Sequence, residues 1–288
     1  MKALSLPAVG ICFFAFAPVS QATGLMDGFT AYQEGRHDEA VEILDTHLSA
    51  HPDHPWATYI LGLSLARIGD STRAETAYTR VLELDPDHAG ANRNLARLYL
   101  GLDDPSRALP SAERAVELSP DGPSWRVLAR VHHDLAHWAQ AEEAYGHSLA
   151  LDDEAPWTLN NYGYLLLEQG RYEEAMAPLA RAVVFDGEVA EFQNNLGVAC
   201  ERNGYPGAAV EAYRRAREAG SANAEHNLAR LPEGLVDSPA LDLGQLAAGF
   251  RAPADSAPET AAFEDPQIPV GDLAAVDMPA SPAPAPTH

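Results

Sequence analysis

The sequence predicts an all-α protein made of tandem helical repeats. Six alanines recur at intervals of 34, 34, 33, 34 and 34 residues, a spacing that indicates a repeat of nearly fixed length. Apolar residues accompany the alanines at spacings of three and four, which place side chains on one face of a helix. The alanines are Ala40, Ala74, Ala108, Ala141, Ala175 and Ala209.

Each copy of the repeat is expected to hold two helices joined by a turn. With the alanine numbered as position 20, position 8 is a small residue, which lets two helices approach closely. Four copies carry a glycine at position 15, where its backbone can end the first helix. These glycines are Gly35, Gly69, Gly170 and Gly204. The copies lie near residues 21–54, 55–88, 89–121, 122–155, 156–189 and 190–223.

This pattern resembles the tetratricopeptide repeat (TPR), in which W-x2-L-G-x2-Y, A-x3-F and a proline describe two antiparallel helices and the link to the next pair. The resemblance covers residues 21–221 and implies a right-handed α-α superhelix, a TPR solenoid of about six hairpins whose neighbours share a continuous core. Besides the six alanines, it is carried by Leu61-Gly62, Leu95-Ala96, Leu128-Ala129, Tyr162-Gly163, Leu196-Gly197, Pro52, Pro86 and Pro120.

The segments that flank the repeats differ from them in composition. Residues 224–231 echo part of the third repeat and are expected to form a capping helix, so the solenoid should span residues 23–232. Residues 233–288 are rich in Ala, Pro and acidic side chains and are expected to be disordered. Two apolar islands interrupt this tail at 241–250 and 263–270. Either is a docking motif or incidental composition, and the first has the further option of folding back as an extra helix.

Residues 1–22 have the features of a cleaved signal peptide. Lys2 precedes an apolar run, and Ser20-Gln21-Ala22 is a small-x-small pattern that suits signal peptidase, so the mature chain should begin near Thr23. The run is shorter than the roughly 20 residues that span a bilayer, which disfavours a membrane anchor. A lipid attached to Cys12 is disfavoured by the residues before it. The predicted location is the periplasm, with an extracellular or membrane-associated location as the alternative.

Composition restricts the classes of partner and of chemistry. The formal net charge of −23 disfavours nucleic acid as a ligand, because a strongly acidic chain repels phosphate backbones. One Lys against eighteen Arg suggests a bacterial source with a GC-rich genome. Removal of the signal peptide leaves Cys200 as the single cysteine, which excludes an internal disulfide. We interpret Cys200 as a buried apolar residue between helices, in preference to a nucleophile.

The resemblance also implies where a ligand would bind. In this family the first helix of each pair faces a concave groove, and in some members asparagines on it hold the backbone of an extended peptide, a role that suits an amide with both a donor and an acceptor. The alternative is that these amides serve helix starts and contacts between repeats. The candidates, at positions 5 and 6, are Asn94, Asn160, Asn161, Asn194 and Asn195.

Four arginines are expected to add a positive focus to the groove. Arg93, Arg97, Arg126 and Arg130 occupy positions 5 and 9 of repeats three and four, where they could converge on a ligand carboxylate. They are similar in kind to the carboxylate clamps of certain TPR proteins without reproducing those positions. The alternative is pairing with local Asp and Glu. Two tryptophans at position 2 are either apolar anchors at the groove edge or packing residues between repeats: Trp56 and Trp157.

No constellation in the sequence points to catalysis, a metal or another cofactor. Paired catalytic carboxylates, a nucleophile elbow and a phosphate-binding glycine loop are missing from it. His132, His133 and His137 have a spacing that can chelate a metal on a helix, but position in the repeat explains two of them. We therefore expect neither an enzyme nor a cofactor-binding protein.

Together these features predict a periplasmic TPR scaffold that binds a peptide or protein segment in its groove. Its size and export signal resemble those of TPR proteins that assist pilus assembly of the Flp/Tad type, other envelope or secretion complexes, or cytochrome c maturation. The alternative is a regulatory or positioning subunit of an envelope enzyme system such as cytochrome c maturation. Self-association, with the tail in its own groove, is a third option.

Overall fold

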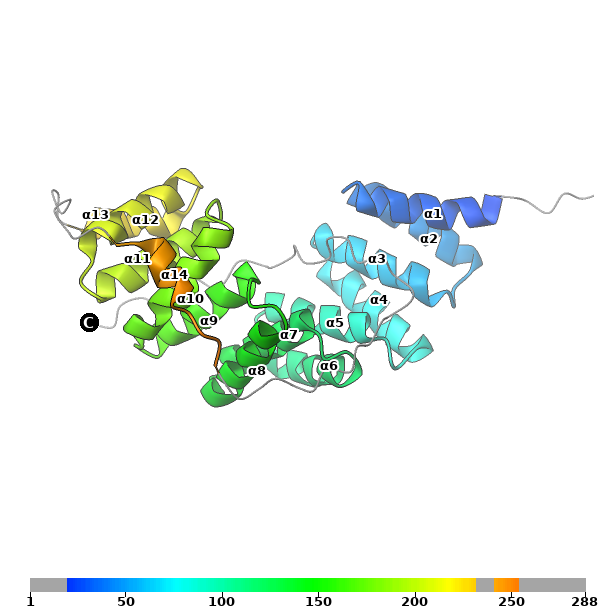
Figure 1. Ribbon diagram of the computed structural model, residues 1–288. Helices are drawn as coiled ribbons and strands as arrows, with labels where there is room; N and C mark the ends of the chain where they lie inside the picture. Colours follow the sequence, from blue (N-terminus) through cyan, green and yellow to red (C-terminus); the bar gives the residue numbers. More distant parts are fainter. Residues whose placement is uncertain (1–19, 232–240, 254–288) are drawn as a thin grey trace, which may run out of the picture. The chain divides into compact units, whose positions relative to one another are not determined.

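The computed structural model describes residues 20–231 and 241–253, with side chains from Gly24 onward. Within these ranges every regular element is an α-helix, and consecutive helices pair as hairpins (Figure 1). This confirms the predicted all-α solenoid class. Most of the predicted signal peptide, residues 1–19, lies outside the described residues, and the first helix begins at Ser20. The chain divides after Pro86 into two units, which we describe separately.

The first unit contains two hairpins. In each hairpin the two helices pack on one another, and the second helix of the first hairpin also packs on the first helix of the next. Leu44 and Tyr78, each four residues after a repeated alanine, are at most 1% exposed. The helices are α1 (Ser20–Gln33), α2 (His37–Ala50), α3 (Pro55–Arg67) and α4 (Ser71–Leu84).

The second unit continues the same pattern with four hairpins and then departs from it. The helix after the last hairpin is the predicted cap, and a six-residue helix follows it after residues that the structure does not describe. The helices are α5 (Ala89–Gly101), α6 (Pro105–Leu118), α7 (Gly122–Asp134), α8 (Trp138–Leu151), α9 (Pro156–Glu168), α10 (Tyr172–Phe185), α11 (Ala190–Arg202), α12 (Pro206–Glu218), α13 (Ala222–Arg230) and α14 (Leu243–Ala248).

Small residues determine how closely the helices of a pair approach. All six repeated alanines are 0% exposed. At position 8, a Cβ added to Gly163 would lie 2.5 Å from Leu179 Cγ, and one added to Gly197 would lie 2.5 Å from the Tyr213 ring. The close approach inferred from the sequence is therefore confirmed, because only a residue without a side chain fits at these points.

Position 15 has a left-handed backbone in every repeat, whichever residue occupies it. The four glycines at this position have φ between 72° and 81°. Repeats three and four have Asp103 and Ala136 there instead, and these residues adopt φ of 58° and 57°. The turn between the two helices is thus set by the fold, and the sequence supplies glycine in only four of the six copies.

Arginines on three of the second helices pair with an acid in the turn that precedes their own hairpin. Arg80 on α4 pairs with Asp53 at 2.5 Å, and Arg114 on α6 pairs with Asp87 at the same distance. Arg181 on α10 pairs with Asp153 at 2.6 Å. Each acid lies in the turn just before the hairpin that carries the arginine. The pairs of Arg80 and Arg114 are exposed, and exposed ion pairs are worth about 0.2–1 kcal/mol each, so these two contribute little to stability.

The tail contains structure that the sequence-based expectation of disorder misses. Residues 241–253 return to the second unit, and α14 packs along α10. Asp242 caps α14 by accepting a hydrogen bond from the Gln245 amide, and Phe250 is buried. The first apolar island therefore folds back on the repeats as an extra helix, which was one of the three options for this segment, and it contributes Phe250 to the core. Residues 232–240 and 254–288, including the second island, lie outside the described residues.

Candidate functional site

The first helices of the repeats in the second unit pack side by side and carry most of the predicted groove residues. Helix α5 contacts α7, and α9 contacts both α7 and α11. Two sets of polar residues occupy these helices. We call Arg93, Arg97, Arg126 and Arg130, on α5 and α7, the arginine surface, and Asn160, Asn161, Asn194 and Asn195, on α9 and α11, the amide surface.

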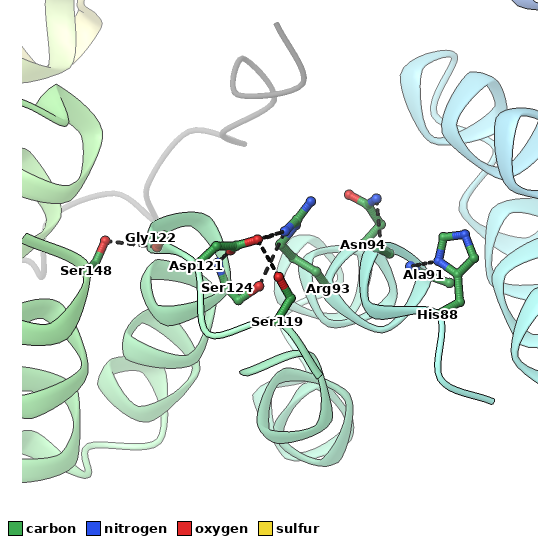
Figure 2. Close-up of polar contacts among 10 residues, drawn as sticks. His88, Ala91, Arg93, Asn94, Ser119, Asp121, Gly122, Ser124 and Ser148 are labelled. Carbon is green, nitrogen blue, oxygen red and sulfur yellow. Dashed lines mark hydrogen bonds and ion pairs between the residues drawn. The ribbon is translucent and has the colours of Figure 1, made fainter. Parts of the chain in front are cut away.

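Arg93 reaches from α5 to the start of α7 (Figure 2). Its Nη1 atom donates to Asp121 Oδ2 at 3.0 Å and to Ser124 Oγ at 3.3 Å. Asp121 is also the N-cap of α7, because its Oδ1 accepts a hydrogen bond from the Ser124 amide at 2.7 Å. The same carboxylate therefore starts one helix and holds an arginine of its neighbour.

The remaining members of the arginine surface differ in their access to solvent. Arg126 is 8% exposed, whereas Arg97 is half-buried. Arg130 donates from Nε to Asp134 Oδ1, one turn further along α7, at 2.7 Å. Burial alone would lower the pKa of Arg130. The charge and the hydrogen bond of Asp134, together with Tyr145 and Glu191, outweigh burial and raise the pKa, so the guanidinium stays charged. Pairing with local acids, the alternative considered for these arginines, is what the structure shows for Arg93 and Arg130.

The amide surface forms hydrogen bonds between repeats. Asn195 on α11 donates from Nδ2 to Asn160 Oδ1 on α9 at 3.0 Å, and Asn160 is 0% exposed. One repeat further, Asn227 on α13 donates to Asn194 Oδ1 at 3.0 Å. The amides thus connect α9, α11 and α13, which is the contact between repeats that the sequence left as an alternative to peptide binding.

Asn94 lies apart from these amide pairs, next to Arg93 on α5. Its Nδ2 atom donates to the Gly90 carbonyl of the same helix at 2.9 Å. Figure 2 shows its side chain on the same side of α5 as the guanidinium of Arg93. Asn94 is half-buried, whereas the four members of the amide surface are all at most 9% exposed.

The two tryptophans pack against aromatic residues. Trp157 meets Phe192 edge-on with ring centroids 4.8 Å apart, and this contact joins α9 to α11. In the first unit, Trp56 lies 5.0 Å from the ring of Phe29 and joins α3 to α1. Both contacts link neighbouring repeats, as the packing interpretation of these residues requires.

A hydrogen-bonded group that the sequence analysis did not identify lies between α7 and α9. His133 is 4% exposed, and its Nε2 atom is 2.7 Å from Glu168 Oε2. The Tyr164 hydroxyl donates to the other oxygen of Glu168 at 2.8 Å. The bond with His133 is the main cause that lowers the pKa of Glu168. The available signal was Tyr164 and Glu168 four residues apart on one helix face.

The three histidines at 132, 133 and 137 do not converge on one point, and Cys200 is buried. His132 and His137 approach to 3.4 Å between their Nδ1 atoms, while His133 turns to Glu168. Burial first, and then His137, lowers the pKa of His132. In the described part of the chain no three His, Cys, Asp or Glu side chains gather into a group that could hold a metal. Cys200 is 1% exposed, and burial raises the pKa of its thiol to about 11, in keeping with its interpretation as a core residue.

A family model for the tetratricopeptide repeat matches the chain over residues 28–78, 59–123, 126–188 and 182–224. The matched segments together cover more than half of the sequence and coincide with the six hairpins. The chain is a tetratricopeptide repeat protein. As a TPR protein it has a fold that typically serves as a non-enzymatic scaffold for protein interaction. No curated protein sequence matches this TPR protein significantly.

Solved structures with a similar fold include several TPR proteins of different origin. A chain of the APC/C hetero-tetramer Cut9–Hcn1 matches with a TM-score of 0.67 and 19% identity over 73% of this chain, which spans only 42% of that longer chain. PilW, described as a widely conserved type IV pilus biogenesis factor, matches with a TM-score of 0.65 and 16% identity over 74% of this chain and 100% of its own. A thermophilic TPR protein from Thermus thermophilus, TTC0263, matches with a TM-score of 0.53 and 23% identity over 63% of this chain and 100% of its own.

These similarities establish the TPR fold and leave the ligand to be argued from the residues. The helices that the structure describes include none with both the length and the apolar character needed to cross a bilayer. The residues available for that argument are the arginine surface on α5 and α7 and the amide surface on α9 and α11.

Proposed function

We propose that this protein is a periplasmic TPR scaffold that binds an extended peptide or protein segment along the first helices of its second unit. The observation that carries the proposal is the arginine surface, because positive side chains gather on two packed helices of a chain with a net charge of −23. Such a cluster attracts a carboxylate-bearing segment, whereas the rest of the molecule repels it.

The contacts of Arg93 support a way of holding a ligand carboxylate. The guanidinium already binds the carboxylate of Asp121 through Nη1, and the Arg93 side chain is 18% exposed. A guanidinium has five N–H donors in a planar fork, which suits bidentate binding of a carboxylate. We propose that an acidic side chain or a chain terminus of the ligand joins Asp121 at Arg93, with Arg97 and Arg130 as further donors. Asn94, beside Arg93, would bond the ligand backbone.

The amide surface has a different part in this proposal. Because Asn160 and Asn195 are buried and paired with each other, their first role is to keep α9 and α11 in register. Asn161 and Asn194, which are 9% and 6% exposed, would contact a ligand at the edge of the amide surface. Trp157 is proposed to support α9 and α11 by packing, and Trp56 to support α1 and α3 of the first unit in the same way.

The cellular role is proposed from the N-terminal sequence together with the fold. A cleaved signal peptide would deliver the protein to the periplasm, where a peptide-binding scaffold can assist assembly of an envelope, pilus or secretion complex. The similarity to PilW is compatible with this role and shows the fold alone. N-terminal sequencing of the protein recovered from a periplasmic fraction should give a start near Thr23. Recovery of an intact Met1 in the cytoplasm would contradict the location.

Peptide display tests the binding surface directly. A library of random peptides with free carboxyl termini is selected on the full-length protein, and one selected acidic peptide is labelled for anisotropy. Arg93→Ala with Arg97→Ala should weaken its binding at least tenfold, because charge-assisted hydrogen bonds are worth about 1.5–3 kcal/mol each.

The matched control is Arg214→Ala with Arg215→Ala on α12. These two exposed arginines lie on a second helix of a repeat and pair with Glu211, so the charge change is the same. The control should bind the selected peptide as the wild type does. Equal loss in both double variants would show that net charge, and not the arginine surface, governs binding, and the proposal would be wrong.

A further inference from the structure

Helix α10 is covered by a segment from beyond the repeats. Residues 241–253 lie against the second unit, with α14 next to α10 (Figure 1). Ala247 and Phe250 are 6% and 5% exposed and belong to the hydrophobic core of this unit. Nine residues, 232–240, connect this segment to the end of the cap. The segment is therefore docked on the array through a small apolar surface of its own.

At the position of Ala180, α10 is apolar where four of the other five second helices carry a charged or polar residue. Met176, Ala180 and Val183 follow each other at spacings of four and three, which makes them one stripe along the helix, and all are buried. The positions of Met176 and Val183 are apolar in several other repeats as well, so Ala180 is what makes the stripe continuous. The residues equivalent to Ala180 are Asp45, Thr79, Glu113, Gly146 and Arg214. Besides its neighbours α9 and α11, α14 is the described element that packs extensively on α10.

Arg181 shows that the segment is recognised by more than apolar burial. The guanidinium carbon lies 5.9 Å from the centre of the Phe250 ring and 5.5 Å from that of Phe185. The Tyr162 ring is 6.3 Å from Phe250 on another side. The Arg181 side chain is 18% exposed, whereas Arg80 and Arg114, at the same position of their repeats, are 41% and 42% exposed. Arg181 is therefore less exposed to water than its equivalents, and the ring of Phe250 lies beside it.

We propose that Met176, Ala180 and Val183 of α10, with Tyr162 and Arg181, form a second peptide-binding site, and that residues 241–253 are its tethered and displaceable ligand. We call these five residues the outer site. Its ligand is a short helix with two leucines three residues apart and an aromatic ring four residues later, the pattern of Leu243, Leu246 and Phe250.

Two features make this ligand replaceable by another chain. The docked helix has six residues, and it leaves Val184 and Phe185 at the end of α10 55% and 41% exposed. A longer helix with the same apolar pattern would also cover these two residues. A short tether gives its ligand an effective concentration on the order of millimolar. A competing chain displaces the tethered segment when its affinity for the site is high enough to offset this concentration. The outer site is independent of the arginine surface, and its failure would leave the proposed function intact.

A synthetic peptide of residues 241–253 tests the site in the full-length protein. The substitution Phe250→Ala removes the anchor of the tethered segment, so this variant should bind the labelled wild-type peptide at least tenfold more tightly than the wild-type protein does. The variant Gln245→Ala, changed on an exposed position of the same helix, should behave as the wild type. Adding Met176→Glu to Phe250→Ala, which introduces the residue type that Glu75 has at the same position on α4, should abolish peptide binding while circular dichroism stays helical.

A second measurement keeps the anchor intact. A nitroxide attached at the exposed position Ala248→Cys reports whether the tethered helix is docked. Excess wild-type peptide should increase the mobility of this label, and the same peptide with Phe250→Ala should not. If several millimolar peptide neither binds the Phe250→Ala protein nor frees the label, residues 241–253 are a fixed part of the fold and the proposal is overturned.

Discussion

The arginine surface and the amide surface share position 5 of their repeats, yet they satisfy their polar groups in different ways. Arg93 and Arg130 pair with carboxylates, and their own side chains are 18% and 21% exposed, so part of each arginine is in contact with water. Asn160 and Asn195 pair with each other and are at most 6% exposed. The difference teaches which residues hold repeats together and which remain accessible to a ligand.

The physical reason is the free energy of removing each group from water. A neutral amide that keeps its hydrogen bonds can be buried at little cost, whereas a buried guanidinium needs a paired charge and further donors and acceptors to compensate for lost hydration. Equal positions in the repeat therefore do not mean equal roles. The amide surface is expected to contribute mainly to stability and the arginine surface mainly to binding.

The largest effect on this comparison is expected from Asn160→Ala. The substitution leaves the buried Nδ2 of Asn195 without its acceptor, which costs about 1–3 kcal/mol in unfolding free energy. Urea denaturation and hydrogen exchange resolved to α9 and α11 measure it. Asn223→Ala, at an exposed position of α13, is the control and should change stability little. Similar stability of both variants would mean that the hydrogen bonds of the amide surface do not hold the repeats together.

The next effect concerns Glu168, at the junction of the two surfaces. Because its pKa is lowered from the usual 4.5 by the bond with His133, the ionised carboxylate stabilises the folded state, fully above pH 4.5 and progressively less as the pH falls through the lowered folded pKa. Glu168→Gln should therefore lower stability by on the order of 1 kcal/mol at neutral pH. The difference from the wild type should shrink below pH 4.5. A difference independent of pH would contradict the assigned cause.

A smaller effect on stability is expected from Arg93→Ala. The variant loses the ion pair with Asp121, but Asp121 still caps α7 through the Ser124 amide. A partly exposed pair of this kind contributes at most about 1 kcal/mol. Thermal unfolding at low and high salt measures the change, which should be below that of Asn160→Ala. A larger loss than for Asn160→Ala would reverse the division of roles between the two surfaces.

The smallest effect is expected at Cys200, inside α11 of the amide surface. A thiol that is 1% exposed and has its pKa raised to about 11 should stay unmodified by iodoacetamide at pH 8 while the protein is folded. A cysteine introduced by Ser106→Cys, at an exposed position of α6, should react within the same time. Rapid modification of Cys200 would show that the α11 region opens, and that the amide surface is less closed than its burial indicates.

The helical hairpins were predictable because their determinants are local and repeated. Ala175, Gly163 and Gly170 act within one repeat, and their spacing alone predicts two helices and a turn. The pairing of Arg93 with Asp121 and of Asn160 with Asn195 joins residues in different repeats, where side-chain rotamers decide between alternatives that the sequence leaves open. Helix α14 was harder still, because the reason for its docking lies in the apolar stripe on α10 and not in the tail.

The turn of the fourth repeat has a consequence for how the array opens. Ala136 holds a left-handed backbone that glycine adopts freely, and a residue with a side chain costs roughly 1–2 kcal/mol there. In a linear array, each hairpin is supported only by its neighbours, so a penalty in one hairpin is a local weak point. The α7–α8 hairpin, like the α5–α6 hairpin with Asp103, is accordingly a place where thermal fraying would start inside the second unit, and Ala136→Gly would strengthen it.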